Sequence, residues 1–176
     1  MFIFILFFYV FRFTFLLLFI KKMKDLVTII VPYFKKKFFF KETINSILNQ
    51  SYKNYEIILI YDDIDISEIE YVKYILKKIK RKKIIINKKN LGAGMSRNIG
   101  IKASKGKFIA FLDADDLWHK NKIKNQIDFM KEKKINFSYC GYKIVNKSKK
   151  FIKKIIAPKK LPFKNFCMHV ILVFQQ

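Results

Sequence analysis

Closely spaced aspartates are the residues of this 176-residue chain whose type and spacing could do chemistry. Asp113 and Asp115 follow the apolar run FIAFL, and residues two apart in an extended strand project to the same side. Two such carboxylates could share a hard divalent cation that bridges a diphosphate and neutralises the charge growing on it as it leaves. The alternative is that Asp115 or Asp116 caps the following helix, and the Asp-x-Asp spacing alone leaves both interpretations open.

A second pair, Asp62 and Asp63, ends the apolar run EIILIY. A carboxylate there could accept a hydrogen bond from a nucleobase imide or a ribose hydroxyl, although aspartate is also common in simple turns. The glycine-rich stretch 92–100 is neither G-x-G-x-x-G nor a P-loop, which disfavours a dinucleotide-dependent dehydrogenase and a P-loop kinase. Arg97 within it could pair with a diphosphate. The alternative is an ordinary surface arginine.

The elements that must position these residues alternate between strand and helix. Apolar runs predict strands at Leu26–Val31, Glu56–Tyr61, Lys83–Ile86, Phe108–Leu112 and Phe137–Tyr142. Helical periodicity predicts helices near 40–50, 66–79, 96–103 and 123–130, with 90–94 as a loop. This alternation predicts a parallel α/β sheet, in which ligands bind at the carboxyl ends of the strands. Both aspartate pairs fall at such ends.

The composition excludes several classes of protein. Hydrophobic residues make up 52% of the chain, which excludes intrinsic disorder, and two Cys with two His disfavour a disulfide framework, a zinc module and a His-rich metal site. The net charge of +24 has two interpretations. One is compositional drift, because Phe, Ile, Lys, Asn and Tyr all have A- and T-rich codons; the other is attraction to an anionic partner. No nucleic-acid-binding motif is present, so nucleic acid is not an expected partner.

Four segments in order resemble the family 2 glycosyltransferases and together cover residues 24–146. They are VTIIVPYF (Val27–Phe34), TINSILNQSYKNYEIILIYDD (Thr43–Asp63), NLGAGMSRNIGIKASKGKFIAFLDADDLW (Asn90–Trp118) and KIKNQIDFM (Lys122–Met130). The resemblance implies the GT-A fold, with a Rossmann-like, mostly parallel sheet that is incomplete at its carboxyl-terminal end. It also implies inverting transfer of a sugar from a nucleotide-sugar, often a UDP-sugar, by direct displacement at the anomeric carbon.

The resemblance also assigns roles by position. It places Pro32 in the loop lining the base pocket, and Asp62 and Asp63 in the nucleotide-sugar site, where Asp63 contacts the base. Arg97 would lie near the donor diphosphate. Asp113 and Asp115 would form the Asp-x-Asp element, in which Asp113 also belongs to the donor site and Asp115 is the more direct ligand of Mg²⁺ or Mn²⁺.

Three departures from the family pattern bear on function. Phe34-Lys35 stands where Tyr-Asn is usual, and Ile64-Asp65 stands where Gly-Ser is usual. The family takes a general base from a region well after the Asp-x-Asp strand, yet no acidic residue follows Glu132. The catalytic base is therefore unassigned. We predict that the chain is truncated before its acceptor-side region, or frameshifted near Pro162–Phe166.

The chain divides into three predicted parts. Residues 1–22 are hydrophobic and long enough to span a bilayer, and Lys21, Lys22 and Lys24 would keep the remainder cytoplasmic. They form either a membrane anchor or sequence upstream of a true start at Met23. Residues 23–146 form the nucleotide-sugar-binding domain, and residues 147–176 form a basic tail.

The function predicted from these parts is sugar transfer to a saccharide or lipid-linked acceptor in surface-polysaccharide or glycoconjugate synthesis, with activity dependent on the missing base. Its expected location is the cytoplasm, with the chain anchored to the membrane or lying at its inner face. The alternative is a non-catalytic, basic, membrane-attached protein or a gene remnant.

Overall fold

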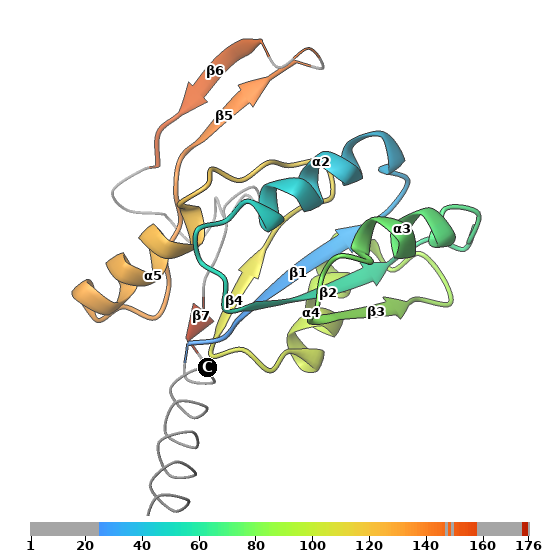
Figure 1. The fold of residues 1–176 in the computed structure, drawn as a ribbon, viewed down its shortest axis with the longest axis horizontal. Helices are drawn as coiled ribbons and strands as arrows, with labels where there is room; N and C mark the ends of the chain where they lie inside the picture. The colour runs from blue at the N-terminus through green and yellow to red at the C-terminus, as the bar shows by residue number, and fades with distance from the viewer. Residues whose placement is uncertain (1–24, 147, 149, 158–173, 176) are drawn as a thin grey trace, which may run out of the picture.

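The computed structural model describes residues 25–146, 148, 150–157 and 174–175, which build a sheet flanked by helices and a separate hairpin (Figure 1). The sheet has the order β3-β2-β1-β4-β7. Its parallel strands are β1 (Val27–Tyr33), β2 (Tyr55–Tyr61), β3 (Lys82–Ile86) and β4 (Phe108–Phe111), and β7 (Phe174–Gln175) lies antiparallel to β4. The predicted parallel α/β sheet is confirmed.

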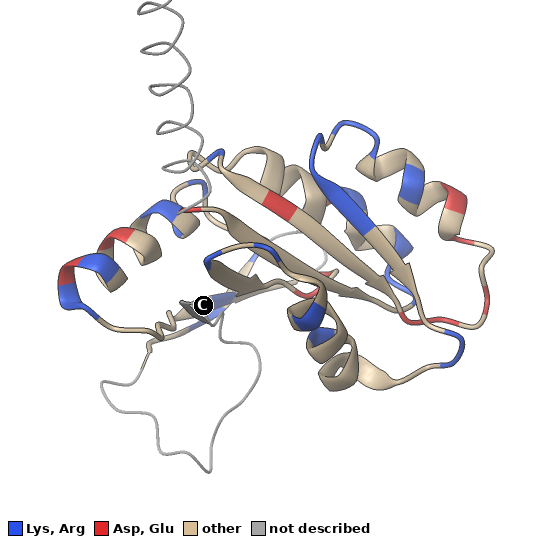
Figure 2. Ribbon diagram, turned by 90° about the horizontal axis from the view of Figure 1, so that it is seen from below, with Lys and Arg blue, Asp and Glu red and all other residues tan. Residues whose placement is uncertain are grey.

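Four helices connect the strands, and two further strands form the hairpin. The helices are α2 (Lys37–Leu48), α3 (Ile69–Leu76), α4 (Gly92–Ala103) and α5 (Lys122–Lys133); the hairpin consists of β5 (Tyr142–Val145) and β6 (Phe151–Ile155). Lysines lie along α5 and along the edge strand β3, on opposite sides of the body, so the positive charge is spread over the surface (Figure 2).

The central strand β1 is buried along its whole length, as its continuous β-branched sequence predicts. One face of the sheet packs against α2, α3 and α5 through a cluster that includes Ile29, Ile44 and Ile127. The other face, including Ile30, packs against α4. Helices on both faces leave the carboxyl ends of the strands as the open edge of the sheet.

Two glycines allow close packing around β1. A Cβ atom on Gly100 of α4 would overlap the side chain of Ile30, and one on Gly106 would lie 2.6 Å from the backbone nitrogen of Thr28. The Gly106 amide donates to Thr28 Oγ1 at 2.8 Å across 78 positions of sequence, and that hydroxyl donates to Glu56 at 2.6 Å across 28 positions. The amino ends of β1, β2 and β4 are therefore joined by side-chain hydrogen bonds.

The predicted strand Phe137–Tyr142 is wrong, because the strand begins only at Tyr142. Two residues that follow Phe137 bind α5 instead of a neighbouring strand. Lys122 Nζ donates to Cys140 Sγ at 2.8 Å, and Gln126 Nε2 donates to Ser138 Oγ at 3.1 Å. These side-chain bonds hold the segment along the helix, and alternating apolar residues could not reveal them.

Two helix boundaries also differ from the predictions. Helix α4 begins at Gly92, within the stretch predicted as a loop, because Gly92 adopts φ +78° and turns the chain directly into the helix. Helix α3 spans Ile69–Leu76 and leaves Ile66 outside, with 60% of its surface exposed. An apolar residue at the right spacing therefore does not guarantee a place on the buried helix face.

The proposed hydrophobic segment 1–22 and the frameshift region Pro162–Phe166 lie outside the described residues. Across the part of the chain that the structure does describe, no helix combines the length and the apolar character needed to cross a membrane.

Candidate functional site

The Asp-x-Asp element lies in a turn at the carboxyl end of β4. The strand ends at Phe111, and the amide of Asp116 donates to the carbonyl of Asp113 at 3.0 Å. The expectation that extended strand geometry continues through Asp115 is therefore wrong. Helix α2 holds this turn in place, because Thr43 Oγ1 donates to the buried carbonyl of Ala114 at 2.9 Å.

Arg97 lies directly beside this turn. Its side chain is 7% exposed and its guanidinium forms an ion pair with the Asp113 carboxylate, which is 27% exposed. The interpretation of Arg97 as a surface arginine is therefore wrong. A guanidinium at this edge of the sheet can meet both a carboxylate and a phosphate, since it presents several donors in a fixed fork.

Lys36 supplies a second cation at the same edge. It follows β1, after a turn in which Lys35 has φ +49°, and its Nζ lies 2.7 Å from Asp115 Oδ2. Both side chains are partly exposed, so this ion pair can exchange with water or with a ligand. Each carboxylate of the Asp-x-Asp element thus has a cationic neighbour.

Asp62 is buried in a network that the sequence did not reveal. Its Oδ1 accepts hydrogen bonds from Asn87 Nδ2 at 2.7 Å and from the backbone amide of Leu91 at 2.9 Å. Asn87 Nδ2 also lies 3.3 Å from Ser96 Oγ on α4. Asp62 therefore connects the end of β2 to the end of β3 and to the loop that leads into the Arg97 helix.

The remaining predicted site residues lie at the ends of β1 and β2. Asp63 is 7% exposed, and its Oδ1 accepts from the amide of Asp65 at 3.1 Å, which is turn geometry. Pro32 is buried within β1 and opposes Ile60 of β2 in the strand register, so its predicted position in a loop is wrong. The fold thus brings the Asp62–Asp63 and Asp113–Asp115 segments to one edge of the sheet.

The carboxylates of Asp113 and Asp115 fit one kind of metal site. The described residues contain no group of three or more His, Cys, Asp or Glu side chains that could enclose an ion. Mg²⁺ and Mn²⁺ are commonly held by one or two carboxylates together with waters and the phosphates of a substrate. The two aspartates therefore fit an ion that arrives with a diphosphate.

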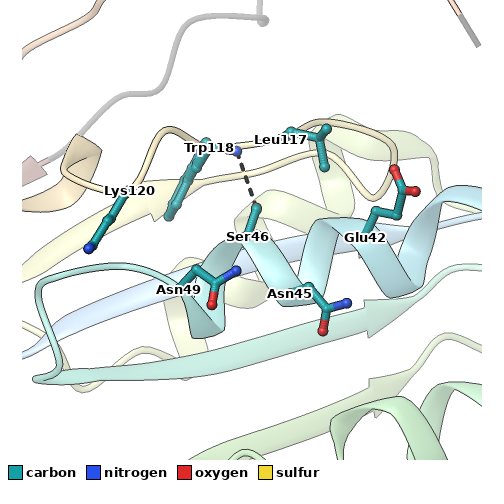
Figure 3. A pocket seen from close by; sticks show the side chains of 7 residues that line it. All are labelled: Glu42, Asn45, Ser46, Asn49, Leu117, Trp118 and Lys120. Carbon is teal, nitrogen blue, oxygen red and sulfur yellow. Dashed lines mark hydrogen bonds between the residues drawn. The ribbon is translucent and has the colours of Figure 1, made fainter. Parts of the chain in front are cut away.

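A groove of about 610 Å³ runs along the outer side of α2 (Figure 3). Its walls come from α2 and from the loop after the Asp-x-Asp turn, and the Trp118 amide donates to Ser46 Oγ at 3.2 Å between them. The lining residues are Glu42, Asn45, Ser46, Asn49, Leu117, Trp118 and Lys120. None of the predicted site residues is among them. The sequence held no signal for this groove, since its residues read as the polar face of a helix and a loop.

Comparisons with known proteins agree with this fold. The family model described as "Glycosyl transferase family 2" matches residues 28–172. A curated relative from Escherichia coli, named UDP-Glc:alpha-D-GlcNAc-diphosphoundecaprenol beta-1,3-glucosyltransferase WfaP, is 43% identical over 122 residues, covering 68% of this chain and 47% of the relative. This chain thus spans about half of that relative's length, and about a fifth of the length of longer relatives from Rickettsia species.

Two solved structures share the fold at low sequence identity. Staphylococcus aureus TarS 1–349 in complex with UDP-GlcNAc has a TM-score of 0.56 at 22% identity, covering 69% of this chain and 34% of that one. The mannosyltransferase PcManGT from Pyrobaculum calidifontis, in complex with GDP-Man and Mn²⁺, has a TM-score of 0.60 at 17% identity, covering 68% and 35%. With the family match extending over most of the chain, this protein belongs to glycosyl transferase family 2.

Proposed function

We propose that residues 23–146 form the donor-binding domain of an inverting glycosyltransferase that takes a UDP-sugar. One observation carries this proposal: two ion pairs, Arg97–Asp113 and Lys36–Asp115, lie at the carboxyl ends of the strands of a parallel sheet. Such an arrangement suits a ligand that combines a diphosphate with a divalent ion. The UDP-Glc in the name of WfaP and the UDP-GlcNAc bound to TarS support uracil as the base.

Each residue has a definite task in this proposal. Asp63 at the end of β2 accepts a hydrogen bond from the base, while Arg97 contacts the diphosphate. Asp113 and Asp115 hold Mg²⁺ or Mn²⁺, with Asp115 the more direct ligand. The bound ion supplies positive charge that stabilises the departing nucleoside diphosphate.

We give Asp62 a different role from the direct contact with the nucleotide-sugar that its sequence position implies. Because its carboxylate already accepts two hydrogen bonds inside the protein, we assign it to shaping the donor site from behind. In contrast, Lys36 joins the diphosphate-binding groups, since its partly exposed ammonium can leave Asp115 for a phosphate oxygen.

Transfer itself needs an acceptor and a base. We propose a saccharide or lipid-linked acceptor in surface-polysaccharide synthesis at the cytoplasmic face of a membrane, which the diphosphoundecaprenol acceptor in the name of WfaP supports. General-base help contributes roughly 10²–10⁴-fold to such reactions. We assign no residue of this chain to the base, and we expect the chain to bind the donor.

Calorimetric titration of the full chain with UDP, with and without Mn²⁺, tests the donor site. We expect binding that depends on Mn²⁺ and is lost in Asp115→Asn. Asp128→Asn is the matched control, because Asp128 also pairs with a lysine, Lys124, but lies on the outer side of α5. Folded protein that ignores UDP in the presence of Mn²⁺, or an Asp115→Asn variant that binds as well as the control, would refute the proposal.

A further inference from the structure

The β5–β6 hairpin projects away from the sheet and its helices (Figure 1). Several of its apolar side chains are exposed: Val145 at 44%, Phe151 at 62% and Ile152 at 60%. A two-stranded hairpin is only marginally stable in water and usually needs a surface to pack on. Exposed apolar residues clustered at the end of such an element indicate a binding surface.

The strand register places charge and apolar surface in a definite order along this hairpin. Lys143 lies directly opposite Lys154, and Val145 lies opposite Phe151 two pairs nearer the turn, beyond the Ile144–Lys153 pair and a register shift that gives Ile152 no partner in the register. By strand alternation Lys143 and Val145 share a face. This face therefore has an apolar pair at its tip and a lysine pair behind it.

The pair Lys143 and Lys154 favours a negatively charged binding partner from outside the hairpin. Like charges directly opposite each other destabilise a pair of strands. No acidic residue follows Glu132 in the sequence, so the hairpin and its flanking segments bring no counter-charge of their own. A second copy of the chain would present the same positive face, which argues against pairing between two hairpins.

The turn at the tip is held by its own hydrogen bonds. The Asn146 amide donates to the carbonyl of Lys150 at 3.0 Å, and the Lys150 amide donates to Asn146 Oδ1 at 2.8 Å. These two bonds join the strand ends at Asn146 and Lys150, next to Val145 and Phe151, so little ordering of the two apolar residues is needed on binding. Lys150 itself is exposed beside them.

We propose that this hairpin docks the protein on an anionic lipid bilayer. Val145, Phe151 and Ile152 enter the interfacial layer, and Lys143 and Lys154 meet the phosphates of the headgroups behind it. Apolar burial combined with attraction of lysines to anionic lipid is the general physics of peripheral membrane binding. The inference stands independently of the donor site, since it uses none of the residues assigned there.

Tryptophan fluorescence tests where the protein meets the membrane. Phe151→Trp places a reporter at the tip, and Phe38→Trp is the matched control because Phe38 is an exposed residue, 94% accessible, on α2. The natural Trp118 is buried at 7% exposure and its signal is subtracted using the unsubstituted full chain. Each protein is mixed with phosphatidylcholine vesicles with or without 30% phosphatidylglycerol, and with brominated lipid as a quencher.

We expect a blue shift and bromolipid quenching for Phe151→Trp on anionic vesicles, and neither change for Phe38→Trp. Salt at 0.5 M should reduce the effect, because it screens the lysines. Reversing both lysines in Lys143→Glu/Lys154→Glu should weaken vesicle binding of the Phe151→Trp reporter on the order of tenfold or more, while keeping the repulsion within the hairpin.

Three results would overturn the proposal. The first is an unchanged Phe151→Trp spectrum on anionic vesicles, even if the chain sediments with them through another segment. The second is an equal response of both reporters. The third is a blue shift without vesicles that grows with protein concentration, which would make a second copy of the chain the occupant of the hairpin surface.

Discussion

Removal of the Asp62 carboxylate should destabilise the protein strongly. Asp62 is 2% exposed, and Asp62→Ala would take away the acceptor for Asn87 Nδ2 and for the Leu91 amide. A hydrogen bond to a charged group contributes about 1.5–3 kcal/mol, and a buried donor left without an acceptor costs a similar amount. Two such bonds predict a loss of about 3–6 kcal/mol in the free energy of unfolding.

Asp62→Asn is the matched control, because both donors meet the same oxygen, Oδ1. An asparagine can place its amide oxygen there and keep both bonds as neutral ones, which contribute about 0.5–1.5 kcal/mol each. We therefore expect it to lose about half as much stability as Asp62→Ala. The two variants separate the hydrogen bonds from the negative charge.

Urea unfolding of the full chain measures these losses. The fluorescence of Trp118 and far-ultraviolet circular dichroism should report the same transition. With a slope of about 1–3 kcal/mol per molar urea, Asp62→Ala should lower the midpoint by about 2 M at unchanged slope. A change below about 1 kcal/mol would refute the structural role of Asp62. If Asp62→Ala kept its stability in this way but lost UDP binding, Asp62 would be a residue that contacts the ligand, as its sequence position implies.

Three further predictions concern packing, pH and the Asp-x-Asp turn. Gly100→Ala should destabilise by about 1–3 kcal/mol in thermal unfolding, because its Cβ would overlap the Ile30 side chain. The same substitution should cost less in an Ile30→Ala background, where the overlap is relieved. A fully stable Gly100→Ala would show that the helix is not tightly packed there. Burial raises the pKa of Tyr52 from 10.0 to about 12, so the unfolded chain loses this proton first and stability should fall as pH rises from 10 to 12. Tyr52→Phe should flatten that part of the curve of unfolding free energy against pH, and an identical slope would contradict the assignment. Thr43→Val removes the hydrogen bond to the carbonyl of Ala114 in the Asp-x-Asp turn. It should weaken Mn²⁺-dependent UDP binding while lowering the free energy of unfolding by only about 1–2 kcal/mol. Unchanged affinity for UDP would mean that the turn keeps its shape without Thr43.

The sheet and its functional edge could be predicted because they follow from local chemistry. Continuous apolar runs such as Val27–Val31 are typical of strands buried on both faces, and β1 is indeed buried throughout. The aspartates come directly after such runs, so their place at the carboxyl ends followed once the sheet was known to be parallel. Neither step required knowledge of contacts between distant residues.

Contacts between distant residues account for most of what the sequence did not reveal. Arg97 is 16 positions from Asp113, and no pattern distinguishes it from an exposed helix arginine. The bond between Thr43 and Ala114 spans 71 positions and forms only when α2 packs beside β4. The Asp62 network depends likewise on β2, β3 and α4 meeting at one place. Packing in three dimensions decides these partners, and periodicity carries no information about them.

The strand order has a consequence for how the protein folds. β1 and β2 are joined at their amino ends by the contact between Thr28 and Glu56, across 28 positions, whereas the contact of β4 with Thr28 through Gly106 spans 78. Closing a longer loop costs more chain entropy before its contacts can compensate, so we expect β4 to join the sheet after β1, β2 and β3 have paired. In pulsed hydrogen exchange the β4 amides should gain protection last, and early protection there would refute this order. Since Asp113 and Asp115 follow β4, a newly made chain would acquire the edge that we propose for base binding first and the turn that we propose for metal binding only as the sheet is completed.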